Sequence, residues 1–300
     1  MTSRRYVDPD QLDLFIPFIT DLPIRDQRDT MERPFFSLAK SKRLKPIDYT
    51  NPDGNVWVKV IPHQSFGMAT IWDADILIWA ASMLTDMKNR HINDIPRQLR
   101  FQPYDLLKAI HRPTGGKEYR YLRDALDRLK STVVKTNIRG RSKRKDRTFS
   151  WIDDWGDLVD EKTEQSLGME ITVSDWFYEG VLMEGGVLAI NPVYFSITGG
   201  RERWLYRVAR KHAGGHAWPG FAITIPTLFE KSGAEGTYRR FKFEIKRVAL
   251  RNELPEFFLI WEEREGEEPS LRMVRRSALT IDHPGFEIPR RRLRRTVGRS

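Results

Sequence analysis

The sequence predicts an α+β protein made of two similar units, each with three helices followed by a β-hairpin. Three observations carry this prediction. The 300 residues suffice for two domains of about 100–200 residues each. Helical and strand-like segments follow in the same order twice. The third helix of each set also matches the other residue by residue.

The first set opens with an apolar stripe at helical spacing. Its second helix begins at Pro103, and proline is a favoured residue in the first turn of a helix. Three helices followed by a two-stranded hairpin form the winged variant of the helix-turn-helix, so tandem winged-helix domains are predicted. The expected elements are a strand over 55–61, helices over 68–88, 103–111 and 117–130, and strands over 132–138 and 148–152.

The second set repeats this order, with a Gly214-Gly215 stop after its first helix and Pro226 opening its second. Its expected elements are a helix over 200–212, a strand over 221–225, helices over 226–232 and 237–251, and strands over 257–261 and 271–274. A shift of 119 aligns the two third helices, and the apolar stripes predicted to face each core are Leu122, Leu126, Leu129 and Phe241, Ile245, Val248.

Charge and composition divide the chain into four parts and point to nucleic acid. Residues 1–30 are predicted to be an N-terminal arm, 31–190 and 191–276 the two winged-helix domains, and 277–300 a basic tail containing six arginines. The net charge of +10 favours nucleic acid as the partner. With no cysteine, no apolar leader and no predicted membrane span, we expect a cytoplasmic protein without disulfides or a thiolate metal site.

The third helix of the second set is the stronger candidate for insertion into a DNA groove. Over 236–250 its five basic residues exceed its single acid, Glu244, by four charges. Over 116–130 five basic residues exceed three acids by two. Carboxylates repel DNA phosphates, so Asp124 and Asp127 weaken the first helix as a reader. The candidate DNA-binding residues on the two helices are Arg239, Arg240, Lys242, Phe243, Lys246, Arg247, Arg120 and Arg123.

The two expected hairpin tips differ in charge. Residues 139–147 are strongly basic and are predicted to be a wing that contacts phosphates. The candidates there are Arg141, Lys143, Arg144, Lys145 and Arg147. Residues 262–268 carry five glutamates and are expected to be held away from DNA.

The sequence favours a binding protein over an enzyme. No phosphate-binding P-loop motif occurs, and Gly214 and Gly215 break the helix that would align His212 with His216 as metal ligands. The acidic run 153–164 could hold Mg²⁺ in a nuclease only if its carboxylates converged. No catalytic residue, metal or cofactor is therefore expected.

Long segments of the chain, between about residues 12 and 262, resemble the plasmid replication initiator protein A family. The resemblance implies a bacterial initiator with two winged-helix domains. Such an initiator binds repeated origin sequences, helps to open the origin and recruits the host initiator ATPase and replicative helicase. Relatives also dimerise through the first domain. The segments that carry it are DLFIPF (13–18), RDQRDTMERPFFSLAKSKRLKPI (25–47), GMATIWDADILIWAAS (67–82), FQPYDLLKAIHRPTGG (101–116), FSWIDDW (149–155), SDWFYEGVLMEGGVLAI (174–190) and GGRERWLYRVARKHAGG (199–215).

We therefore expect a sequence-specific, double-stranded-DNA-binding initiator of plasmid replication. The alternative is a transcriptional repressor that uses the same helices without a role in replication. On the expectation that helix 237–251 reads the sequence, Arg239→Ala and Lys246→Ala should each cost about 1–3 kcal/mol of cognate binding. Arg120→Ala and Asp127→Ala should cost less.

Overall fold

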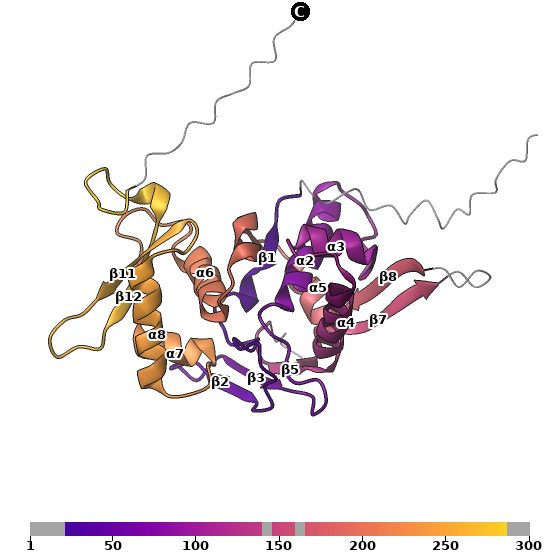
Figure 1. Ribbon diagram of the computed structural model, residues 1–300, viewed down its shortest axis with the longest axis horizontal. Helices are drawn as coiled ribbons and strands as arrows, with labels where there is room; N and C mark the ends of the chain where they lie inside the picture. The colour runs from indigo at the N-terminus through magenta and orange to yellow at the C-terminus, as the bar shows by residue number, and fades with distance from the viewer. Residues whose placement is uncertain (1–21, 140–145, 160–165, 287–300) are drawn as a thin grey trace, which may run out of the picture.

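The computed structural model describes residues 22–139, 146–159 and 166–286 (Figure 1). Two units of the same construction lie side by side, with a separate sheet between them. The first unit begins with the N-terminal described residues, and its winged helix contains α2 (Ala74–Asn89), β4 (Gln98–Phe101), α3 (Pro103–Ala109), α4 (Gly116–Ser131), β7 (Ile152–Val159) and β8 (Ser166–Val173). The second contains α6 (Gly200–His212), β10 (Phe221–Thr224), α7 (Ile225–Ser232), α8 (Tyr238–Arg251), β11 (Phe257–Glu262) and β12 (Ser270–Arg275).

The sheets confirm the internal repeat. Each unit has a three-stranded antiparallel sheet in which the last strand lies in the middle, in the orders β4-β8-β7 and β10-β12-β11. The apolar stripes predicted for α4 and α8 are buried. Helix, strand, helix, helix and hairpin therefore occur twice, and the fold is a tandem winged helix. In Figure 1 the hairpins β7–β8 and β11–β12 point away from each other, and α4 and α8 each lie beside their own hairpin.

The hairpin predicted to be the wing of the first unit belongs to a different sheet. Strands β5 (Val133–Thr136) and β6 (Arg147–Phe149) do pair, but they belong to a four-stranded sheet, β2-β3-β5-β6, with β2 (Ile47–Thr50) and β3 (Trp57–Ile61). The hairpin in the wing position is β7–β8, because β8 pairs with β4 as β12 pairs with β10. Strand β5 instead pairs with β3, which precedes all three helices, a long-range choice that local pattern does not reveal.

Two predicted domain boundaries also change. Residues 22–30 are not part of an arm, because β1 (Arg25–Gln27) pairs with β9 (Val187–Ala189) and Asp26 is buried. Residues 1–21 lie outside the described residues. At the other end, η4 (Arg276–Ala278) and the buried Leu279 belong to the second unit. Residues 287–300, with the arginine-rich tail, also lie outside the described part. No helix within that part is long and apolar enough to cross a membrane.

A row of ion pairs joins the two units. Arg203, Arg207 and Lys211 are four residues apart and therefore share one face of α6. Arg203 Nη1 lies 2.6 Å from Asp75 Oδ1. Arg207 contacts both oxygens of Asp26 at 2.6 and 2.9 Å. The arginines and aspartates of this row are less than 5% exposed, so each charge depends on its partner.

Glu32 continues the row and contacts three side chains of the second unit. Lys211, His212 and Lys231 lie 2.7–2.8 Å from its carboxylate oxygens. Burial raises the pKa of Glu32, but the hydrogen bonds from these side chains outweigh burial and hold the pKa well below its ordinary value of 4.5. The carboxylate is thus a charged link between the first unit and the helix-turn-helix of the second.

Removing Asp26 should destabilise the whole protein. Asp26→Asn leaves the Arg207 guanidinium buried without a counter-charge, so the free energy of unfolding should fall by about 3–5 kcal/mol. Urea denaturation measures this. The control is Asp48→Asn, which removes the exposed Asp48–Lys59 pair at 3.0 Å and should cost no more than about 1 kcal/mol. Equal losses in the two variants would contradict this role of the buried pair.

Glu32 should make the free energy of unfolding depend on pH. Its folded-state pKa is lowered, so its contribution is complete above the unfolded-state value near 4.5 and is lost as the pH falls through and below that value. The difference in unfolding free energy between the parent and Glu32→Gln should therefore be constant near neutral pH and shrink below about pH 4.5. Chemical denaturation over this pH range measures the difference in unfolding free energy. A difference that grows on acidification would contradict a lowered pKa of Glu32 in the folded state.

Candidate nucleic-acid interface

Helix α8 is built to present one face outward. Thr237 caps its N-terminus by accepting a hydrogen bond from the Arg240 backbone N–H at 3.3 Å, and Asn252 ends it in the left-handed conformation. The apolar side chains Phe241, Ile245 and Val248 face the core. The rest of the circumference faces solvent, the hairpin β11–β12 and the start of α6, where Glu244 pairs with Arg201 and Arg251 pairs with Glu202.

The outward face of α8 combines arginines with large apolar side chains. Phe243 is 61% exposed and Leu250 is 72% exposed. The Arg247 guanidinium lies 5.8 Å from the centre of the Phe243 ring. Among the described residues, no carboxylate lies within 4.0 Å of the side chains of Arg239 or Arg247. These two cations therefore keep their charge available to a ligand. Arg240, another predicted DNA-binding residue, pairs with Glu244 at 3.0 Å on the same helix.

Two predicted reading residues face the hairpin instead. The Lys246 ammonium lies 3.0 Å from Glu263 and 5.3 Å from the centre of the Trp261 ring. Lys242 lies 4.0 Å from Glu268. Tyr238 donates to the same Glu268 at 2.7 Å. Burial and this hydrogen bond raise the pKa of Tyr238 to about 12. The acidic hairpin thus lies directly against α8, where its glutamates pair with both lysines of the helix.

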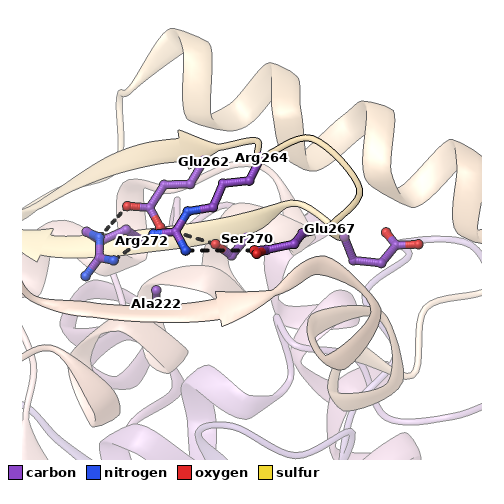
Figure 2. A pocket seen from close by; sticks show the side chains of 7 residues that line it. Ala222, Glu262, Arg264, Glu267, Ser270 and Arg272 are labelled. Atoms are coloured by element: carbon purple, nitrogen blue, oxygen red, sulfur yellow. Dashed lines mark hydrogen bonds and ion pairs between the residues drawn. The ribbon is translucent and has the colours of Figure 1, made fainter.

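The base of this hairpin is held by its own ion pairs (Figure 2). Arg272 donates to both oxygens of Glu262 at 2.5 and 3.2 Å, and the Ser270 hydroxyl donates to the same carboxylate at 3.2 Å. Arg264 lies 3.8 Å from Glu267 nearer the tip. These residues line a small polar hollow beside β10. The contacts between β11 and β12 thus hold the hairpin whose loop begins at Glu263, the residue that pairs with Lys246 of α8.

Helix α4 is more fully engaged by its own hairpin. Arg123 donates to both oxygens of Asp157 at 3.0 and 3.1 Å, and Lys130 pairs with Asp154. Asp127 is not free on the outward face, because it accepts a hydrogen bond from Trp155 Nε1 at 3.2 Å. Asp127 aligns with Lys246, and each contacts a tryptophan on the first strand of its wing. Packing against the hairpin therefore constrains this position in both units.

The remaining candidates fall in different places. Arg147 lies on β6 and pairs with Glu179 at 3.2 Å, away from the hairpin tip. Arg141, Lys143, Arg144 and Lys145 lie outside the described residues. On α4, Arg120 is exposed.

The described members of the acidic run 153–164 pair with separate cations, as with Asp153 and Arg97 at 2.7 Å. No group of three metal-ligating side chains occurs within the described part.

Comparison with known proteins connects these two units to replication. The family model of replication initiator protein A matches residues 25–259. This chain belongs to the replication initiator protein A family. A relative in Wigglesworthia glossinidia brevipalpis, named "Putative replication protein", is 35% identical over 236 residues, which cover 78% of this chain and 83% of that protein. The matched region of the initiator chain includes both helices α4 and α8.

The fold of the initiator is shared with a solved structure of low sequence identity. The crystal structure of domains 2 and 3 of RctB superposes with a TM-score of 0.55 at 13% identity. The match covers 86% of the initiator chain and 99% of the RctB chain. The likeness therefore concerns the overall fold of most of the initiator chain.

Neutralising the acidic hairpin should strengthen DNA binding. In Glu263→Gln/Glu268→Gln, Lys246 and Lys242 lose their carboxylate partners and become available to phosphates. Affinity for both cognate and scrambled duplexes should rise, and log affinity should depend more steeply on log salt, by about 0.9 for each added phosphate contact. Fluorescence anisotropy over a salt series measures both. The control is Glu265→Gln, which removes one charge from the same tip. Unchanged affinity in the double variant would show that the lysines take no part in binding.

Proposed function

We propose that this protein is a sequence-specific DNA-binding initiator of plasmid replication. It binds repeated sequences at the origin and promotes opening of the adjacent duplex. Membership in the replication initiator protein A family supports the role in replication. The observation that carries DNA binding is the outward face of α8. There Arg239 and Arg247 flank Phe243, at the helix position that enters the major groove in helix-turn-helix proteins.

The chemistry of this face suits base reading. Arginine donates two parallel hydrogen bonds to the O6 and N7 acceptors of guanine, and an aromatic ring packs on a thymine methyl group. Arg239 lies in the first turn of α8, where such helices place their base contacts. Lys242 and Lys246 are directed toward the hairpin and paired with its glutamates, so in this proposal they take no part in reading bases. The wing position of the first unit is likewise acidic, and α4 makes the weaker contact with DNA.

The proposed activity is binding rather than catalysis. The carboxylates of a Mg²⁺-dependent nuclease must converge on the ion. Asp153, Asp154 and Asp157 instead pair with three different cations. The resemblance to plasmid initiators extends the proposal to the host initiator ATPase and replicative helicase as partners, and to homodimers formed through the first domain.

Loss of either unpaired arginine of α8 should reduce discrimination between DNA sequences. We expect Arg239→Ala and Arg247→Ala each to weaken binding to the cognate repeat by about 1–3 kcal/mol, with a smaller effect on scrambled DNA. Arg120→Ala is the matched control, because Arg120 occupies the position in α4 that Arg239 occupies in α8. A competition assay on both duplexes measures the ratio. Greater loss of discrimination in Arg120→Ala would place the reading function in the first unit.

Replication and repression are separated by a plasmid maintenance test. The gene is supplied in trans to a plasmid that carries the cognate repeats but lacks its own initiator. The parent should maintain this plasmid, whereas Arg239→Ala/Arg247→Ala should not. A protein that binds the repeats tightly but leaves the plasmid unreplicated would support the repressor alternative.

A further inference from the structure

A basic loop of the first unit lies against the helix-turn-helix of the second. Residues 39–46 connect the core segment around Phe36 to β2 and include Lys40, Lys42 and Lys45, all exposed. No carboxylate within the described chain lies within 4.0 Å of these three ammonium groups. The loop therefore presents three uncompensated positive charges on a short stretch of surface, unlike the lysines of α8, which are paired with glutamates.

Arg43 fixes this loop to the second unit. It is the buried residue among exposed neighbours, with 6% of its surface exposed. Its Nη1 donates to the carbonyl oxygen of Gly233 at 2.6 Å, and its Nε donates to the carbonyl oxygen of Lys45 at 2.9 Å. A side chain placed in this way both closes the loop and ties it to a residue 190 positions later.

Gly233 lies at the turn between α7 and α8. It ends α7 in the left-handed conformation, with φ of 56°, and a Cβ at this position would lie 2.6 Å from Pro34. The first unit thus packs directly on the turn of the helix-turn-helix. In helix-turn-helix proteins the helix that precedes the recognition helix crosses the DNA backbone, so in the proposed complex a loop held at this turn would lie beside the phosphates that flank the groove.

Two further contacts order the lysine side chains themselves. The Lys40 ammonium lies 5.1 Å from the centre of the Trp72 ring. The Lys42 stem passes over Gly67, where a Cβ would lie only 2.8 Å from Lys42 Cγ. The Met68 backbone N–H donates to the carbonyl oxygen of Arg43 at 3.1 Å and closes the other side of the loop. Side chains that are already ordered lose less entropy when they bind an anion.

We propose that the loop 39–46 is a second DNA contact, in which Lys40, Lys42 and Lys45 bind backbone phosphates beside the groove occupied by α8. This inference rests on the proposed function and adds a contact supplied by the other unit. Lysine binds phosphate as a point charge and reads no base edge here, so the loop contributes affinity without sequence preference. Arg43 is a positioning residue, because it contacts protein groups and holds the lysines at the turn.

The test compares Lys40→Ala/Lys42→Ala/Lys45→Ala with the parent on cognate and scrambled duplexes over a salt series. Affinity for both duplexes should fall by a similar factor, about tenfold or more at low salt. The plot of log affinity against log salt should flatten by about 0.9 for each lost contact. The ratio of cognate to scrambled affinity should stay at the parent value. A hydroxyl-radical footprint on the cognate repeat should lose protection on one side only.

The control is Lys40→Arg/Lys42→Arg/Lys45→Arg, which keeps the three charges and should retain the parent affinity and salt slope. Arg43→Gln should reproduce part of the flattened salt slope, with thermal melting measured in parallel to show that the fold persists. If the parent binds cognate DNA and the alanine variant binds with the parent affinity and slope, the loop proposal alone is overturned. If the parent binds neither duplex, the proposed function and the loop proposal fall together.

Discussion

The arrangement of the molecule depends on the ion pairs between α6 and the first unit. Arg203 and Arg207 are buried with Asp75 and Asp26, and an unpaired charge in such a site is strongly destabilising. Glu32 extends the contact to Lys231 on α7, the first helix of the helix-turn-helix. Because these pairs hold α6 and α7 against the first unit, they help to set where α8 lies relative to α4.

The hairpins balance the positive charge of the reading helices. In each unit a carboxylate of the wing pairs with a cation of the third helix, as in Asp157 with Arg123 and Glu263 with Lys246. Phosphates of any sequence must compete with these carboxylates, whereas Arg239 and Arg247 meet no such competition. In the proposed complex this arrangement lowers nonspecific affinity and leaves base contacts from α8 to carry discrimination. The loop around Arg43 then restores affinity from the other unit.

Local pattern predicted much of the fold, because the information needed lies within each element. Helical spacing identified the buried faces of α4 and α8, and the repeated order of elements identified the two winged helices. Long-range pairing was not visible in the same way. The pairing of β5 with β3 removed the basic loop from the wing position. The segment around Asp26 read as a polar arm because its partner, Arg207, lies 181 residues away.

The candidate site shows the same division. Sequence placed the charges of α8 correctly on the side away from the core, but not their distribution around it. Helical spacing places Lys246 and Asp127 on the side of each helix that faces away from the core. Only the tertiary fold shows that each contacts a tryptophan of its wing. The sequence predicted no role for Arg43. Its role follows from the backbone carbonyl of Gly233, which no residue pattern near Arg43 signals.

The proposed function requires that α8, rather than α4, contacts the bases. Site-specific photocrosslinking tests it directly, with a benzophenone amino acid placed at Phe243 or at Tyr121, which is exposed on α4. Each protein is irradiated in complex with the cognate repeat, and the attached nucleotide is mapped. We expect a strong crosslink from position 243 to a defined base and a weak or absent one from position 121. A base crosslink from position 121 alone would contradict it.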